Sequence, residues 1–187
     1  MSLRSQLGDL RRSVLSGLCR RSVPLTARGP IVTFTFDDFP RTALTTGAAI
    51  LEDFGARGTY YVAMSLMDSR NELGEQFRAA DLRAAVDRGH ELGSHTFSHL
   101  SARRVGLDVL ENDAERGEQA LRQQIGELSN GNFAYPYGEA TLGAKNRLGS
   151  KFVSCRGTCG GLNGPEVDLN LLRANRLSVF GMHLRLH

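Results

Sequence analysis

Residues 31–38 read IVTFTFDD, and they decide the fold of this 187-residue chain. The first six are apolar or β-branched, as in a buried β-strand, and the last two are adjacent carboxylates, Asp37 and Asp38. A helical pattern follows over residues 42–54, and a second run of strand composition over residues 59–64. A strand, a helix and a strand in this order predict a parallel sheet with helices packed outside it.

The same alternation continues along the rest of the chain. Further strands are expected at residues 91–94, 132–135, 151–154 and 177–180, and further helices at residues 77–88 and 107–128. An open doubly wound sheet and a closed or nearly closed barrel both fit this pattern. The chain is shorter than the roughly 250 residues of a full eight-stranded barrel, and it is too short for two ordinary domains.

The beginning of the chain is strongly basic. Six arginines crowd the first thirty residues, and Asp9 is the only acid among them. We therefore expect residues 1–29 to form a basic N-terminal arm, partly helical, before a single domain at residues 30–187. No aromatic residues interleave with the arginines, so a solvated helix face is favoured over nucleic-acid binding.

No export signal or transmembrane segment is predicted. The apolar stretch at residues 13–19 is short and bounded by arginine pairs, unlike the continuous core of a signal peptide. No run approaches the roughly 20 apolar residues that cross a bilayer. Cys19, Cys155 and Cys159 are an odd count and are expected to be reduced thiols, which favours the cytoplasm.

Two histidines, His95 and His99, follow the strand expected at residues 91–94. On a helical turn, a spacing of four residues rotates the second imidazole about 40° from the first, so both can reach one ion. The carboxyl ends of parallel strands share one edge of a sheet, which brings Asp37 and Asp38 to the same place. Two imidazoles and one carboxylate leave open coordination positions for a catalytic metal, and the other carboxylate remains for proton transfer.

A third motif at this edge is the sequence YPYG at residues 135–138, which predicts a turn after a strand. Such a turn can direct a main-chain N–H at a developing oxyanion, and its rings can line a sugar pocket. Three separate motifs therefore converge on one edge of the predicted sheet.

The motifs TFDD at residues 35–38, HTFSH at 95–99 and YPYG at 135–138 resemble, in this order, the first three motifs of the polysaccharide deacetylase family, or NodB-homology domain. The resemblance spans roughly residues 29–180. It implies an α/β fold, a distorted (β/α) barrel with fewer than eight strands in which helices lie outside a parallel sheet. It also implies hydrolysis of N- or O-acetyl groups on an amino-sugar polysaccharide or oligosaccharide, with zinc, or else cobalt or nickel, as the divalent metal. No nucleic-acid partner is expected, and the oligomeric state is left open.

The resemblance also implies a role for each motif residue. Asp38, His95 and His99 would hold the metal, and Asp37 would be the general base that activates water. The main-chain N–H of Tyr137 would stabilise the oxyanion.

Two further roles are implied for residues outside this set. His187, in a Leu-x-x-His setting at the end of the sequence, would be the general acid, and His183 is a second candidate. Phe39, Tyr135 and Pro136 would line the substrate pocket.

Three departures from the family pattern accompany these similarities. Phe39 stands where glycine is usual, Ala134 stands where an arginine usually orients the base, and the chain has no tryptophan. Another group must then orient the base, or the base is less well tuned. The departures raise two alternatives, a non-catalytic carbohydrate-binding homologue and a hydrolase of another small acyl amide such as a formyl group or an imide.

Overall fold

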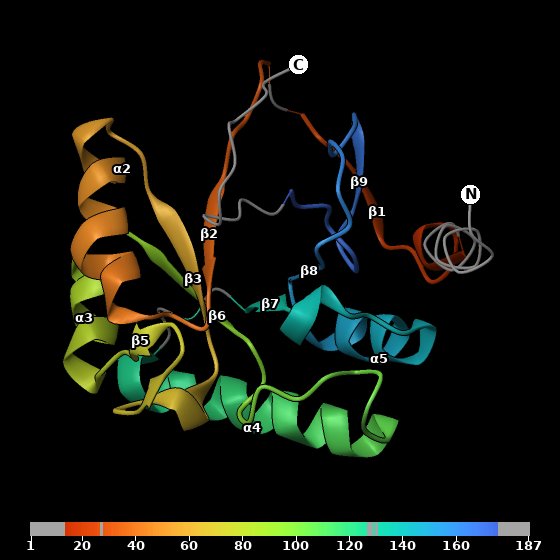
Figure 1. Ribbon diagram of the computed structural model, residues 1–187. Coiled ribbons are helices and arrows are strands. Elements are labelled where there is room, and N and C mark those ends of the chain that lie inside the picture. Colours follow the sequence, from red (N-terminus) through yellow and green to blue (C-terminus); the bar gives the residue numbers. More distant parts are fainter. Residues whose placement is uncertain (1–13, 27, 127–128, 130, 176–187) are drawn as a thin grey trace.

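The computed structural model describes residues 14–26, 28–126, 129 and 131–175. Its main sheet has five parallel strands in the order β2-β3-β6-β7-β8. The strands are Phe34–Asp37 (β2), Gly58–Val62 (β3), Glu91–Ser94 (β6), Asn132–Ala134 (β7) and Ser154–Arg156 (β8). The sheet curls into a half-barrel with the helices around its outside (Figure 1). This architecture confirms the predicted fold class, a parallel barrel-like sheet with fewer than eight strands.

The helices follow the strands along the chain. They are a π-type segment at Ala43–Ala48 that continues into α2 (Ala49–Asp53), then α3 (Ala79–Asp87), α4 (Leu107–Ile125) and α5 (Leu142–Lys151). Short 3₁₀ turns occupy Met64–Leu66 and Pro136–Gly138. Two small antiparallel pairs complete the fold, β1 (Ser22–Pro24) with β9 (Glu166–Asp168) and β4 (Arg70–Asn71) with β5 (Gly74–Glu75).

Helix α4 joins the two halves of the core. Its residues Leu121 and Ile125 pack into a cluster built on β3 and β6, whereas Leu110 and Ala114 pack into a second cluster around Phe133. These positions recur at helical spacing, so one apolar stripe faces the sheet along the whole helix. Each fully buried leucine or isoleucine contributes about 1.5–3 kcal/mol through removal of apolar surface from water. The stripe therefore fixes α4 beneath the histidine motif.

The first strand of the sheet is shorter and more exposed than its composition predicts. Strand β2 begins at Phe34, and Ile31 and Val32 before it are 59% and 75% exposed. The expectation of a buried strand over the whole run was wrong, because among the described strands β2 lies at the edge of the sheet and pairs only with β3. Packing of the Phe36 ring on Tyr60, with centroids 4.8 Å apart, covers one side of the strand.

Two other features differ from the sequence prediction. Phe54, expected on the apolar stripe of the first helix, is 84% exposed. Lys151 ends α5 instead of beginning a strand, and the helix itself was not predicted. Its N-terminal signal is Thr141, whose hydroxyl accepts a hydrogen bond from the Ala144 N–H at 3.2 Å. The strand expected at residues 177–180 lies outside the described residues.

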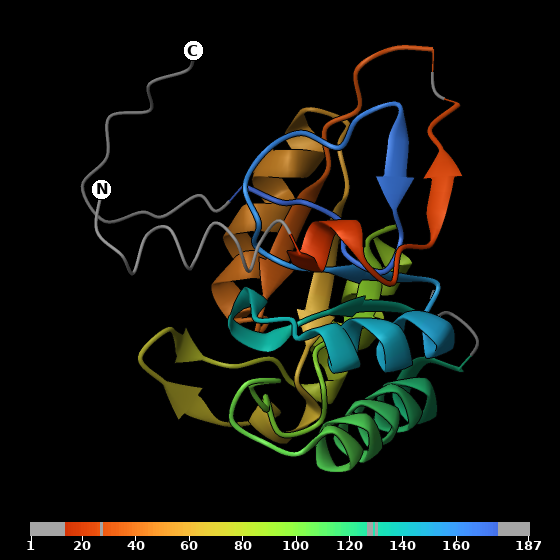
Figure 2. The same cartoon turned by 90° about the vertical axis from the view of Figure 1, so that its right-hand side faces the viewer.

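The described part of the basic arm packs on the C-terminal part of the domain. Strand β1 pairs with β9, and the two lie side by side in Figure 2. The buried Lys145 ammonium donates to the carbonyls of Leu15 and Leu18 at 2.5 and 2.6 Å and lies 2.7 Å from Asp168. The Lys145 ammonium thus links the arm to α5 and β9 through two hydrogen bonds and one ion pair. Among the described residues, no helix combines the length and apolar character that a membrane crossing requires.

Candidate active site

The register of the sheet places three residues in one row at its carboxyl edge. Asp37 is opposite Tyr61, and Tyr61 is opposite Gly93. A Cβ on Gly93 would lie 2.7 Å from the Tyr61 ring, so the glycine leaves the space that this ring occupies. The row therefore sets a flat aromatic surface beside the first carboxylate of the TFDD motif.

The second carboxylate lies between the two histidines. Asp38 Oδ1 is 3.0 Å from His99 Nε2 and 3.6 Å from His95 Nε2. The potential ligand atoms of these three residues all lie within 4.8 Å of one another. Donors bound to one ion at 2.0–2.2 Å are separated by about 3–3.5 Å, so this donor set fits a single metal ion with modest adjustment. The structure thus brings together the three residues that the sequence assigned to a metal.

The His95 ring is held in one orientation by the strand next to it. Its Nδ1 is 2.7 Å from the carbonyl oxygen of Ala134, so Nδ1 carries the proton and donates it there. The Nε2 lone pair then points toward Asp38, as in a metal-ligating histidine with a carbonyl partner. Burial lowers the pKa of His95 from its usual value, which favours the neutral, ligating form.

Helix α4 holds the histidine turn from below. The Asp113 carboxylate accepts hydrogen bonds from the N–H groups of Phe97 and Ser98 at 3.1 and 2.8 Å, and from the Ser98 hydroxyl at 2.9 Å. A Cβ on Gly117 would lie 2.6 Å from the main chain of Thr96, so only glycine lets the turn approach this closely. The spacing of His95 and His99 is therefore fixed by contacts that α4 provides.

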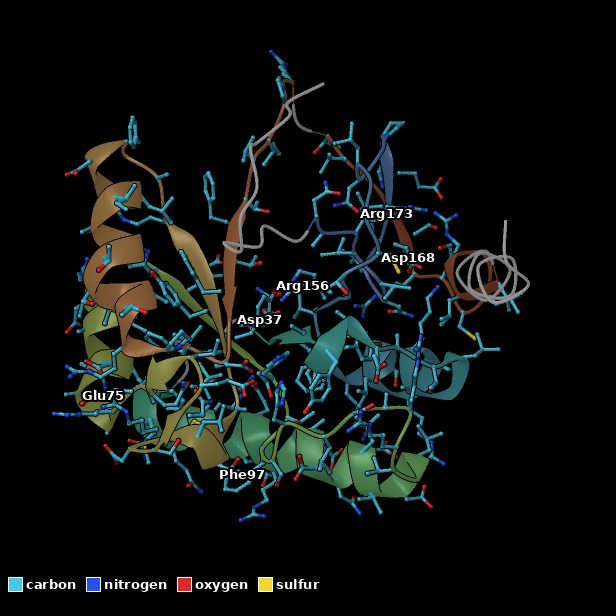
Figure 3. All side chains as sticks on the ribbon, viewed as in Figure 1. Asp37, Glu75, Phe97, Arg156, Asp168 and Arg173 are labelled. Carbon is cyan, nitrogen blue, oxygen red and sulfur yellow. The ribbon has the colours of Figure 1, made fainter. Side chains whose placement is uncertain are left out.

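Arg156, at the end of β8, supplies the cation beside Asp37. Its side chain points toward Asp37 (Figure 3), and its Nη2 donates to Asp37 Oδ1. Its guanidinium carbon lies 4.7 Å from the centroid of the Tyr61 ring. The Arg156 side chain is only 7% exposed. Strands β2 and β8 are the two edges of the sheet, so this ion pair spans the open side of the half-barrel. Arg156 on β8 thus takes the place of the arginine that is missing at position 134 on β7.

The sequence analysis did not find Arg156. The only local signal was the missing arginine at Ala134, which required a substitute but did not identify one. Several arginines in the chain could have served, and the curl of the sheet decides which one reaches Asp37.

The backbone of the site is strained at five non-glycine residues. Asp38, Phe39, Thr96, His99 and Tyr137 have φ angles of 64°, 60°, 61°, 54° and 60°. Each left-handed residue costs about 1 kcal/mol or more, and such strain concentrates at functional sites. The positive φ of Phe39 also explains why glycine is usual at this position.

The predicted substrate-lining residues are buried, which corrects that assignment. Phe39 and Tyr135 have no exposed surface: Phe39 packs on Tyr60 and Phe77, and Tyr135 packs on Phe133. Pro136 is buried as well. The hydrophobic effect draws these side chains into the core, so they cannot contact a saccharide.

Tyr137 is the exposed ring of the YPYG turn. It is 57% exposed, and its centroid lies 4.6 Å from that of His99. The role of its main-chain N–H at an oxyanion stays a prediction. The two candidate general acids, His183 and His187, lie outside the described residues.

Comparisons with known proteins show which family and which relatives the chain resembles. The sequence profile of the polysaccharide deacetylase family matches residues 25–152. A chitooligosaccharide deacetylase of Sinorhizobium fredii is 28% identical over 120 residues, which cover 63% of this chain and 52% of that protein. A gellan lyase of a Bacillus species is 27% identical over 146 residues, which cover 78% of this chain and 5% of that protein. The chain thus spans about half of one curated relative and a small fraction of the other.

A solved structure shows the same fold. The structure of IcaB from Ammonifex degensii superimposes with a TM-score of 0.74 at 19% identity, over 96% of this chain and 85% of that one. The family profile covers more than half of the sequence, including all three motifs. The chain therefore belongs to the polysaccharide deacetylase family.

Proposed function

We propose that this protein is a metal-dependent hydrolase that removes acetyl groups from an amino-sugar polysaccharide or oligosaccharide. The observation that carries the proposal is the adjacency of two carboxylates with different surroundings. Asp38 faces His95 and His99, whereas Asp37 faces Arg156. In this proposal Asp38 holds a metal, and Asp37 accepts a proton.

The donor set favours zinc among the common divalent ions. Two imidazoles and one carboxylate suit zinc, cobalt or nickel better than magnesium or calcium, which prefer oxygen ligands. When bound, such an ion lowers the pKa of water and polarises the acyl carbonyl. Asp38, His95 and His99 would hold it, with the His95 orientation fixed by the Ala134 carbonyl.

Asp37 acts in this proposal as the general base. The Arg156 guanidinium lies against one of its oxygens, which orients the carboxylate and leaves the other oxygen to accept a proton from water. The Tyr61 ring packs against the Arg156 guanidinium, so two side chains, Arg156 and Tyr61, hold the base in place. Tyr137 is placed at the same edge, where its main-chain N–H would stabilise the oxyanion.

The two alternative functions have less support. The non-catalytic homologue was suggested by the missing arginine at position 134 and by the absence of tryptophan from the sequence, and Arg156 contacts the base in place of that arginine. The hydrolase of another acyl amide was suggested by the bulk of Phe39, whose ring lies in the core and does not reshape the pocket.

The test is acetate release from chitooligosaccharides in the presence of zinc or cobalt. We expect Asp37→Asn to lose about three orders of magnitude in kcat, because the amide cannot accept the proton. Asp53→Asn, an exposed aspartate at the end of α2, is the matched control and should behave as the wild type. Equal rates for Asp37→Asn and the wild type would contradict the proposal.

A further inference from the structure

A groove of about 820 Å³ adjoins the candidate active site at Tyr137. Its walls come from five distant parts of the chain, namely residues 16–20 before β1, Arg103, the loop at 137–139 after β7, the loop at 158–160 after β8, and Arg173. Its volume is within the range of about 300–1,000 Å³ that is usual for ligand sites. The roles proposed above use only one of its residues, Tyr137.

The lining of this groove is basic. Arg20, Arg103 and Arg173 all contribute to it, against a single acidic residue, Glu139. The three arginines come from different segments and are all exposed to solvent. Guanidinium groups that converge from separate segments on one concave surface raise the local concentration of anions and pair with carboxylates or phosphates in a bidentate manner.

Two of these arginines also contact carboxylates of the protein. Arg103 is 3.3 Å from Glu139, and Arg20 is 3.3 Å from Glu166. Both arginine side chains are about two-fifths exposed, and such pairs contribute only about 0–1 kcal/mol each. Each pair uses one of the five guanidinium N–H groups, so the others can bind a ligand.

The third arginine is held in place without a charge partner. Arg173 Nη1 donates to the Gly160 carbonyl at 3.2 Å, and its main chain exchanges two hydrogen bonds of 3.0 Å with the Asn163 side chain. Within the part of the chain that the structure describes, no carboxylate forms an ion pair with Arg173. In Figure 3 it lies beyond Arg156 from Asp37, on the side of β9.

The groove is continuous with the site through Tyr137. The Tyr137 ring contacts His99 on the metal side, and the Arg104 guanidinium lies 5.8 Å from its centroid. A glycan with one sugar at Asp38 and His99 would extend over Tyr137 into the groove.

We infer that this groove is a subsite for an anionic substituent of the glycan, a carboxylate or a phosphate, and that the substrate is an acidic amino-sugar polymer. This inference rests on the proposed function and names its substrate class. The cationic lining gives no advantage to a neutral polymer such as chitin, because neutral hydroxyl groups pair less strongly with guanidinium than anionic oxygens do.

The experiment compares three tetrasaccharides as ligands and substrates of the zinc-loaded protein. They are neutral N-acetylchitotetraose, a hyaluronan tetrasaccharide that carries carboxylates, and a chitotetraose that carries a 6-phosphate. We expect the anionic ligands to bind about ten-fold more tightly than the neutral one at low salt, with the preference decreasing as ionic strength rises from about 0.05 to about 0.5 M. The stronger of the two anionic ligands identifies the group.

The variant Arg173→Gln should reduce the ratio of anionic to neutral affinity about 3- to 10-fold. The matched control is Arg147→Gln, a partly exposed arginine on α5 that pairs with Asp108 and Glu111 outside the groove. It should keep the wild-type ratio. Equal affinity for all three ligands, or an unchanged ratio in Arg173→Gln, would overturn the inference.

The two proposals fail in different ways. Tight binding of anionic ligands without acetate release from any of them would contradict the deacetylase and leave the subsite standing. Acetate release with no preference for anionic ligands would contradict the subsite and leave the deacetylase standing.

Discussion

Two buried histidines flank the same strand, and their ring nitrogens have different partners. His90 precedes β6 and His95 follows it, and their residues are 4% and 1% exposed. The His90 Nδ1 accepts a hydrogen bond from the Gly58 N–H at 3.1 Å, and its Nε2 lies 2.9 Å from Glu52. Both nitrogens of His90 are therefore occupied by the protein, whereas the Nε2 of His95 faces Asp38 and His99.

The contrast extends to the position of the proton. His90 must be protonated at Nε2, because its Nδ1 accepts from a main-chain N–H. His95 must be protonated at Nδ1, because that atom faces the Ala134 carbonyl. The two ends of one strand thus hold opposite tautomers. Burial alone does not distinguish a structural histidine from a ligand; the partners of the second nitrogen do.

Among variants that test this difference between the two histidines, substitution of His95 should have the largest effect on activity. We expect His95→Ala to lose the bound metal and about three orders of magnitude in activity, because the metal supplies several kcal/mol of transition-state stabilisation. Metal analysis of the purified variant and acetate release are the measurements. A stoichiometric ion retained in His95→Ala would contradict the assignment.

The corresponding change at the other end of the strand affects stability instead. His90→Ala should lower the free energy of unfolding by about 2–4 kcal/mol, because it leaves a cavity and an unpaired Gly58 N–H. Urea denaturation measures this loss, and the folded variant should still bind one metal ion. Loss of the metal without loss of stability would reverse the roles given to the two histidines.

A third variant tests the cation beside the base. Arg156→Gln should lower kcat about 10- to 100-fold while the metal content and KM change little, because the guanidinium acts through Asp37. Arg156→Lys keeps the charge but loses the flat contact with Tyr61, so its kcat should lie between those of the wild type and Arg156→Gln. A change confined to KM would mean that Arg156 contacts the substrate and not the base.

The support beneath the histidine turn has a smaller effect. Asp113→Ala should weaken metal binding about ten-fold, because the turn that carries His95 and His99 loses three hydrogen bonds. Asp108→Ala, on the same helix and pairing with Arg147 on the surface, is the matched control. Equal metal affinity in the two variants would show that the turn keeps its shape without α4.

The pH dependence of stability gives the smallest effect. Burial lowers the pKa of His90, so the unfolded chain binds a proton below its usual pKa of 6.5 that the folded chain does not, and stability falls with pH from there. The Arg88 guanidinium lowers the pKa of Glu52 to about 2, so a second loss follows between about 4.5 and 2. Denaturation midpoints across this range should show both declines, and Glu52→Gln should lack the second.

The sequence was sufficient for residues whose positions follow from local rules. Asp37 and Asp38 end a strand, and His95 and His99 follow another, so the parallel-sheet rule alone brings them to one edge. Spacing along the chain carried this information.

The sequence was not sufficient for contacts and side-chain directions that depend on the tertiary fold. Arg156 reaches Asp37 only because the sheet curls, which no local pattern reports. Phe39 and Tyr135 belong to motifs of the site, yet their rings point into the core, and the motif does not indicate the direction of a side chain. Helix α5 was not predicted because two glycines interrupt its apolar pattern. Ala144 and Leu148 are its main buried apolar residues.

The pairing of β1 with β9 has a topological consequence. Ser22 lies opposite Asp168, so the earliest and latest described strands are one strand spacing of about 5 Å apart. The pair therefore closes a loop that contains nearly the whole described chain. The entropic cost of closing a loop rises only slowly with its length, so a short two-stranded contact can tie together segments this distant in the sequence.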